Sequence, residues 1–240
     1  MTAKYGANAS VWIDAVDASV YFNEAALDIG VDTAETTTFQ SGGWKTFIEG
    51  LAGAKSTVKG FYDATNDAAV MGYIMNTGSV LTYGPYGMLA IGDTARLVKI
   101  HETTAAESSP IGGAVLVNAA FTADGQVGFG WTLHPNSVDT GTTTGADRDD
   151  SAATTTGWQA HLHVIAVSSG SWVLKLQDAA TNDWTDVTGG AFTAATGATS
   201  QRLVSAAATT TLRRHIRYVA TVTGGSSPTI TFALAYSRNR

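Results

Sequence analysis

Residues 114–133, AVLVNAAFTADGQVGFGWTL, decide the fold class of this chain. Apolar side chains recur at every second position on both sides of an Asp-Gly pair: Val115, Val117, Ala119 and Phe121 before it, and Val127, Phe129, Trp131 and Leu133 after it. This period places each set on one face of a β-strand. The Asp124-Gly125 pair between the two runs predicts that they form a hairpin.

The opposite face of the second run carries only small residues, Gly128, Gly130 and Thr132. A hairpin with one apolar face and one smooth face is typical of a sheet that packs on one side and is open on the other. We therefore expect these three residues to form an open wall.

The composition agrees with β-structure. Of the 240 residues, 44% are apolar, 14% are charged and 26 are glycine. A core can therefore form, and glycine marks turns and bulges. The chain has no cysteine, which excludes disulfides, cysteine zinc sites and thiol catalysis. No apolar run reaches the length of about 18 residues that spans a membrane.

Working outward, short strands are predicted along the whole chain. Those before the quoted stretch are 11–14, 20–22, 54–62, 80–83 and 94–103; those after it are 158–167, 172–177, 184–187, 201–204, 212–222 and 229–236. Residues 33–50 read as a long hairpin or extended loop that turns at Gly42-Gly43. One short helix is expected after Asp63 or Asn66, with Ala69, Val70, Tyr73 and Ile74 on one stripe and Gly78 past its end.

These patterns predict an all-β protein with two domains. Residues 136–156 are rich in Thr, Gly and Asp and contain one large apolar residue, Val138. We therefore expect a first β-barrel or sandwich with one flanking helix over 1–136, a linker or exposed loop over 137–156, and a small β-sandwich over 157–240.

The charge is uneven. Residues 1–135 hold 6 Lys/Arg and 13 Asp/Glu, a net charge of −7, and residues 136–240 hold 8 and 7, a net charge of +1. A nucleic-acid reader would need a basic face, so the sequence argues against that class.

No catalytic motif is present, and we expect neither an enzyme nor a cofactor. His161 and His163 lie on one strand face, which could supply two metal ligands, but a polar cross-strand pair is the favoured interpretation and no metal site is expected. Trp158, Trp172 and Trp184 either fill a sandwich core, which we favour, or form a sugar-stacking platform in which Trp172 and Trp184 would contact a glycan.

Several stretches resemble tail tube proteins, also called major tail proteins, of long-tailed bacteriophages. They are TTTF (36–39), GGWKTFIEGLAGAKSTVKGFYDA (42–64), VLTYGPYG (80–87) and SSPIGGAVLVNAAFTADGQVGFGWTLHP (108–135). The resemblance covers roughly residues 1–135. The second part, with GWQAHLHV, WVLKLQDA and RRHIRYVATV, is similar to the carbohydrate-binding-module-like sandwiches appended to phage structural proteins.

The resemblance implies a subunit of the virion, made in the bacterial host cytoplasm, that forms stacked hexameric rings around a channel. DNA would pass through this channel without specific binding, and tape measure and terminator proteins would be neighbours. Gly128, Gly130 and Thr132 would then face the lumen. No membrane association is implied.

The hairpin or loop at 33–50 has an expected role in such an assembly. Phe39, Trp44, Phe47 and Ile48 give it more apolar surface than a solvated loop should carry, so we expect them to contact a neighbouring subunit. The alternative is that they fold back over their own barrel. Other open interpretations are a tail terminator, a baseplate hub, a capsid decoration protein and a carbohydrate-binding module.

Overall fold

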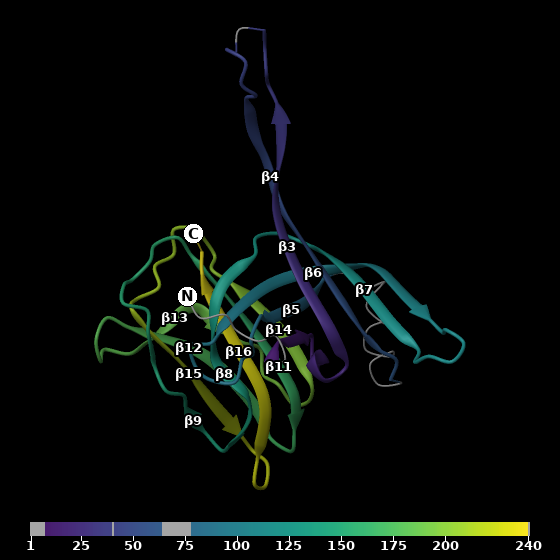
Figure 1. The fold of residues 1–240 in the computed structure, drawn as a ribbon. Coiled ribbons are helices and arrows are strands. Elements are labelled where there is room, and N and C mark those ends of the chain that lie inside the picture. The colour runs from purple at the N-terminus through teal and green to yellow at the C-terminus, as the bar shows by residue number, and fades with distance from the viewer. Residues whose placement is uncertain (1–7, 40, 64–77, 240) are drawn as a thin grey trace. The chain divides into compact units, whose positions relative to one another are not determined.

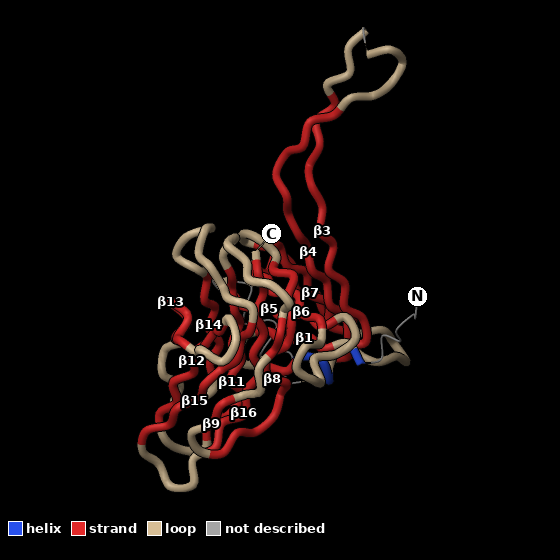
Figure 2. Tube along the Cα trace, turned by 90° about the vertical axis from the view of Figure 1, so that its left-hand side faces the viewer, coloured by secondary structure: helices blue, strands red, loops and turns tan. Residues whose placement is uncertain are grey.

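A computed structural model of the chain describes residues 8–39, 41–63 and 78–239. Antiparallel strands dominate these residues (Figures 1 and 2), which confirms the all-β class. The expected helix over 64–77 lies outside the described residues.

The chain divides into two compact units. Unit 1 comprises Met1–Val20, Ser79–Val98 and Gly128–Arg240, and unit 2 comprises Tyr21–Gly78 and Lys99–Val127. Neither unit begins or ends where the sequence suggested a division, at residues 136 and 157. Because unit 1 combines three stretches of the chain and unit 2 combines two, the two units are interleaved in sequence.

Unit 1 contains strands of two sheets. The first has the order β14-β11-β16-β8-β6-β5-β1-β2, and the second has the order β10-β15-β12-β13, with β9 also beside β15. The bounds of these elements are β1 (Ser10–Ile13), β2 (Val16–Asp17), the 3₁₀ helix η2 (Ala18–Val20), β5 (Ser79–Gly84), β6 (Thr94–Ser108, of which only the first part belongs to unit 1), β8 (Gly128–Thr140), β9 (Thr143–Thr144), β10 (Arg148–Asp149), β11 (Trp158–Val167), β12 (Ser171–Ala179), β13 (Thr185–Ala191), β14 (Thr199–Val204), β15 (His215–Thr223) and β16 (Thr229–Arg238).

The two sheets of unit 1 enclose one apolar core. Trp158 and Leu162 of β11 and Phe232 of β16 come from the first sheet, and Trp172 of β12 comes from the second; all four are fully buried. Leu133 of β8 also belongs to this core, so the sandwich expected from the last third of the chain extends further back in sequence. The burial of these aromatic residues is what holds the two sheets together.

Unit 2 is a four-stranded antiparallel sheet in the order β3-β4-β7-β6, with β3 (Phe22–Glu35), β4 (Phe47–Phe61), β7 (Leu116–Ala123) and the second part of β6. Val117, Ala119 and Phe121 of β7 are at most 3% exposed and share a face with the buried Val58 of β4. The other face is largely exposed. The alternation predicted for the first run is therefore confirmed.

The predicted hairpin at Asp124-Gly125 is wrong. β7 pairs with β4 and β6, and β8 pairs with β6 and β16. Both β7 and β8 run antiparallel to β6, opposite residues 100–108 and 94–97 respectively. The reason is that the backbone N–H of Asp124 donates to the carbonyl of Lys99 at 2.8 Å, and its carboxylate binds the Lys99 ammonium. The chain therefore continues along β6 through the Asp-Gly pair.

The open wall expected from Gly128, Gly130 and Thr132 is also absent, because all three are buried and Thr132 is only 1% exposed. Gly128 lies against the side chains of Gln159 and Ser237, and a Cβ on Gly130 would collide with the backbone carbonyl of Tyr236. The small residues allow close approach of neighbouring strands and do not line a surface of the chain.

The segment 137–156 differs from the expected linker or exposed loop. It continues β8 and contributes β9 and β10, which pair with β15. The Asp150 side chain is 2% exposed and accepts hydrogen bonds from the Tyr236 hydroxyl and the Arg238 guanidinium, each at 2.6 Å. This buried carboxylate ties the segment to β16.

Candidate functional site

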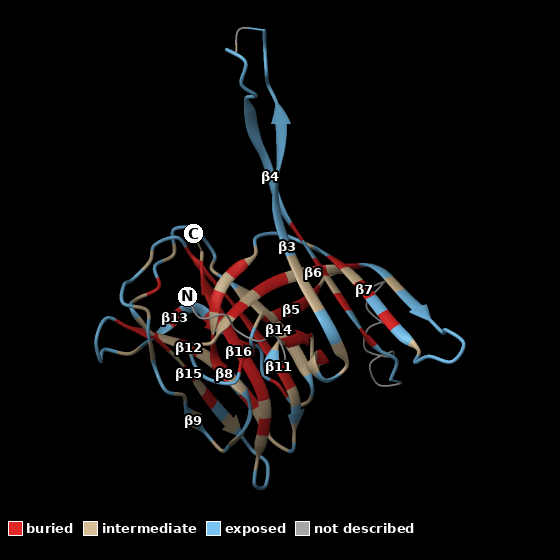
Figure 3. Cartoon of the chain, viewed as in Figure 1, coloured by how far each residue is buried: buried red, intermediate tan, exposed pale blue. Residues whose placement is uncertain are grey.

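The long β3–β4 hairpin of unit 2 carries the predicted contact residues. We call residues 28–53 the arm and its turn, residues 36–46, the tip. All described residues of the arm are exposed except Ser41, which is half-buried (Figure 3). A two-stranded ribbon with both faces in water is at best marginally stable. The arm is therefore a structure whose surfaces suit burial against another molecule.

Hydrogen bonds hold the tip without any apolar core. The Thr36 N–H donates to the Thr46 carbonyl at 2.8 Å, and the Thr38 N–H donates to the Ser41 hydroxyl at 2.9 Å. Gly42 and Gly43 have φ of 64° and 84°, which supply the turn that the sequence predicted. Lys45 pairs with Glu35 at 3.0 Å across the ribbon. The local polar contacts leave the aromatic side chains free to point outward.

The four predicted contact residues lie together on this end of the arm. Phe39 and Trp44 of the tip are 112% and 81% exposed, and Phe47 and Ile48 at the start of β4 are 53% and 59% exposed. The structure thus excludes the alternative that these residues fold back over their own sheet. The neighbouring subunit that they would contact remains a proposal.

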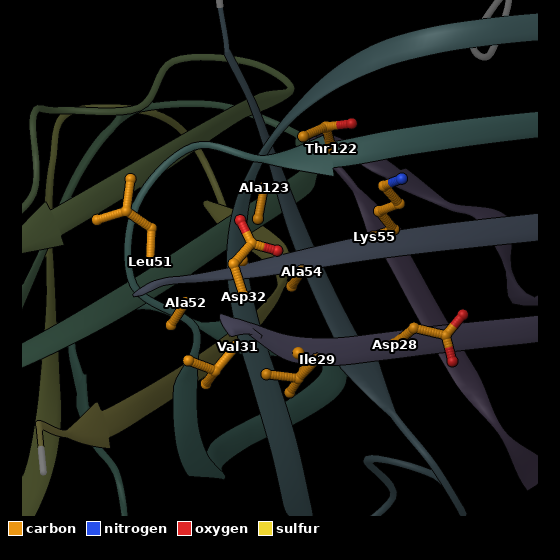
Figure 4. A pocket seen from close by; sticks show the side chains of 12 residues that line it. Asp28, Ile29, Val31, Asp32, Leu51, Ala52, Ala54, Lys55, Thr122 and Ala123 are labelled. Atoms are coloured by element: carbon orange, nitrogen blue, oxygen red, sulfur yellow. The ribbon is translucent and has the colours of Figure 1, made fainter. Parts of the chain in front are cut away.

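A groove of about 630 Å³ lies at the base of the arm (Figure 4). Ile29, Val31 and Leu51 are 44%, 50% and 84% exposed there, and Asp28 and Lys55 add charges at one end. The arm therefore exposes large apolar side chains from its base to its tip, and a surface of this kind is typical of a protein interface.

One edge of the unit 2 sheet is formed by β3, which is 14 residues long and pairs with β4 among the described strands. Its other edge presents backbone N–H and C=O groups and has no proline. Such an edge pairs readily with another strand. It is a second feature that suits association between copies of the chain.

The predicted metal and glycan residues lie in unit 1. His161 and His163 are at most 1% exposed, and the Thr82 hydroxyl lies between them, 3.1 Å from His161 Nδ1 and 2.7 Å from His163 Nε2. Burial lowers the pKa of both imidazoles, that of His163 to about 4. The favoured polar-pair interpretation fits this geometry, although the third partner comes from β5. No group of three metal-ligating side chains occurs within residues 8–39, 41–63 and 78–239.

The alternative interpretation, a glycan platform that includes Trp172 and Trp184, does not fit the structure. Trp172 is fully buried in the sandwich core and cannot contact a sugar. Trp184 is half-buried; the Arg217 guanidinium lies 4.0 Å from the centre of its ring, and His215 contacts it edge-on. Because a cation already covers the ring, Trp184 has less aromatic surface for stacking on a sugar.

Sequence reasoning missed one unusual group. Glu102 of β6 is 8% exposed, and neither of its carboxylate oxygens has a hydrogen-bond partner. Burial raises its pKa to about 7. Glu102 lies opposite Phe121 on the buried face of unit 2. The register that places it there is not visible in the sequence, because a β-bulge follows it.

No helix within the described ranges has the length and apolar character to cross a membrane. No protein-family model matches the sequence, and no curated protein matches it.

Similar solved structures come from phage and phage-like particles. One chain in the virion of a native gene transfer agent (GTA) particle is 12% identical to this protein. The match covers 53% of this chain and 98% of that chain, with a TM-score of 0.42. The SPP1 Dit protein is described as a paradigm of the hub adsorption apparatus in phages that infect Gram-positive bacteria. It is 13% identical to this protein, and the match covers 95% of this chain and 98% of that chain, with a TM-score of 0.41. A chain of the SPP1 tail tube is 14% identical to this protein, and the match covers 51% of this chain and 77% of that chain, with a TM-score of 0.38. Similarity at this level assigns neither a family nor a function to the chain.

Proposed function

We propose that this chain is a structural subunit of a bacteriophage tail tube, which assembles with copies of itself into stacked rings around the channel for DNA ejection. The observation that carries the proposal is the arm. Its strands and its tip expose apolar side chains along their whole length, including Trp44 at 81%, and no residue within 8–39, 41–63 and 78–239 covers them. Contact with further copies would bury this surface.

The sequence resemblance to tail tube proteins supports the same assignment, because one of its matching stretches, residues 42–64, begins in the tip and continues along the second strand of the arm. Ring closure follows from a head-to-tail interface, in which the edge of β3 and the arm of one copy meet different surfaces of the next. In this proposal the rings are hexameric, tape measure and terminator proteins are neighbours, and the protein resides in the virion without enzymatic activity or cofactor.

Negative-stain electron microscopy of the purified chain tests the proposal. Long tubes of constant diameter are the expected result. Isolated rings that never stack would instead favour a terminator or baseplate hub, and spikes bound to purified capsids would favour a decoration protein. Monomers at every concentration would refute assembly in any of these forms.

The same images can be repeated with sheared phage DNA present. A tube subunit that lets DNA pass without binding should show the same tube length and abundance with and without DNA. Assembly only in the presence of DNA would contradict a channel whose wall does not hold nucleic acid.

A further inference from the structure

The groove at the base of the arm has bare backbone at its centre. Gly30 of β3 and Gly53 of β4 stand directly opposite each other in the register of the two strands, and both line the groove. A Cβ built on either glycine would have nothing within 4 Å, and neither residue has a positive φ. The two glycines therefore serve neither a turn nor a close strand contact. They leave open space over flat peptide units.

Charged and apolar side chains flank these glycines. Asp28 and Lys55 lie at one end of the groove, and Leu51, which is 84% exposed, lies at the other (Figure 4). Asp32 also lines the groove. Among the described residues, Lys55 and the two aspartates form no ion pair, whereas the other three lysines of unit 2 each pair with a carboxylate. The groove therefore combines an apolar wall with three available charges that sum to −1.

The tip of the arm matches this groove in shape. Trp44 is 81% exposed at the end of a two-stranded ribbon, so its flat ring is available to a neighbouring surface. A planar indole packs closely on peptide groups that no side chain covers, and Leu51 offers a second apolar contact beside it. Glycine in a strand is the residue that permits such a close approach to the backbone.

The tip also matches the groove in charge. Residues 36–46 contain one charged residue, Lys45, and its side chain is 69% exposed. The stretches of unit 2, 21–78 and 99–127, hold ten Asp/Glu against four Lys, so the tip is a cationic segment of an acidic unit. Lys45 pairs with Glu35, but an exposed ion pair stabilises little, so the ammonium can exchange this partner for a carboxylate of the groove.

A chain cannot fill the groove with its own tip. Strands β3 and β4 remain paired from the groove to Glu35, which stands opposite Phe47. The six residues from Gly30 to Thr36 span about 20 Å in a strand. This paired ribbon holds the tip of a chain away from its own groove (Figure 1), whereas the tip of a second copy is not restrained in this way.

We propose that the tip of one copy docks in the groove of another copy, with Trp44 on the backbone of Gly30 and Gly53 and with Lys45 beside the aspartates of the groove. Docking of this kind rests on the proposed function, to which it adds the surface that receives the arm. Because the tip and the groove are different surfaces, each copy uses its tip on one neighbour and its groove on another. The contact is therefore head-to-tail and propagates along an assembly.

A side chain added to the floor of the groove tests the docking. Gly53→Val fills the open space and suits a β-strand, so the subunit should stay folded, which circular dichroism and the thermal midpoint verify. We expect the critical concentration for assembly to rise by about 30-fold or more, the effect of losing half of the cover of Trp44. Gly197→Val adds the same side chain at another open position, in unit 1, and should assemble like the wild type.

A double variant shows whether the tip and the groove form one contact. Trp44→Ala combined with Gly53→Val should assemble no worse than the more severe of the two single variants, because both remove the same contact. Full addition of the two effects would overturn the inference. Assembly of folded Gly53→Val at the wild-type critical concentration would overturn it as well.

Cross-linking locates the contact whether or not tubes form. The chain has no cysteine, so Thr46→Cys marks the tip in one preparation and Leu51→Cys marks the groove in another. A bismaleimide added to the mixture should join positions 46 and 51 of different copies, identified by mass spectrometry, and Leu89→Cys in place of Leu51→Cys should give no such product. Tubes without the 46–51 product would overturn the inference and leave the proposed function standing. The product without tubes would do the reverse, and monomers without the product would overturn both.

Discussion

Trp44→Ala removes the largest apolar side chain of the tip. A tryptophan buries about 150–250 Å² when it is covered. At 81% exposure almost all of that area is open in the subunit, so full coverage by a neighbour would contribute about 4 kcal/mol at about 25 cal/mol per Å². Half coverage would contribute about 2 kcal/mol. The substitution should therefore weaken each contact by about 30-fold to 1,000-fold.

The assay is the critical concentration for assembly, measured by light scattering and pelleting and checked by microscopy. Because Trp44 makes no apolar core within its own subunit, the thermal midpoint of the unassembled chain should stay unchanged. Leu89→Ala, at a residue 69% exposed outside the arm, serves as the control and should assemble like the wild type. Assembly of Trp44→Ala at the wild-type critical concentration would refute the role of the tip.

Three further predictions concern the fold. Gly130→Ala should lower the free energy of unfolding by about 1–3 kcal/mol, measured by urea titration, because its Cβ would meet the Tyr236 carbonyl, whereas Gly53→Ala has open space and should change little. Glu102→Gln should stabilise the chain by about 2 kcal/mol at pH 7.5 and hardly at all at pH 4.5, because a folded pKa of about 7 costs stability only as pH rises above the unfolded value of 4.5. A stabilisation independent of pH would exclude this cause. The depressed pKa of His163, about 4, should cost the wild type about 3 kcal/mol as pH falls from 6.5 to 4, and His163→Asn should reduce that slope; equal slopes in both proteins would show that other groups dominate.

The strands were predictable because each is defined by local alternation. The strand Trp158–Val167 matches the expected bounds residue for residue, and β16 begins at the predicted Thr229. The turn at Gly42-Gly43 was also predictable, since positive φ favours glycine. These signals lie within a few neighbouring residues and need no knowledge of the partner strand.

The errors arose where the structure of a segment depends on which strand pairs with it. Asp124-Gly125 is a strong turn signal, but the bonds of Asp124 to Lys99 keep the chain running along β6, and nothing near it in sequence identifies Lys99. Glycine at positions 128 and 130 can indicate either an open wall or a close contact with a neighbouring strand. Only the position of β16 distinguishes these two interpretations.

The arm was located correctly because its apolar residues violate the composition of a solvated loop. Phe39, Trp44, Phe47 and Ile48 were singled out on that ground, and all four are exposed in the structure. The second half of the same surface, Ile29 and Val31, was missed, since the sequence analysis predicted no strand between residues 22 and 33, where β3 runs.

Sedimentation velocity over a hundredfold range of protein concentration tests most directly whether the chain assembles with copies of itself. The account predicts that the 24.9 kDa species gives way to one discrete ring mass and then to a series of its multiples. A single 24.9 kDa species throughout, with the arm as accessible to protease at the highest concentration as at the lowest, would contradict it.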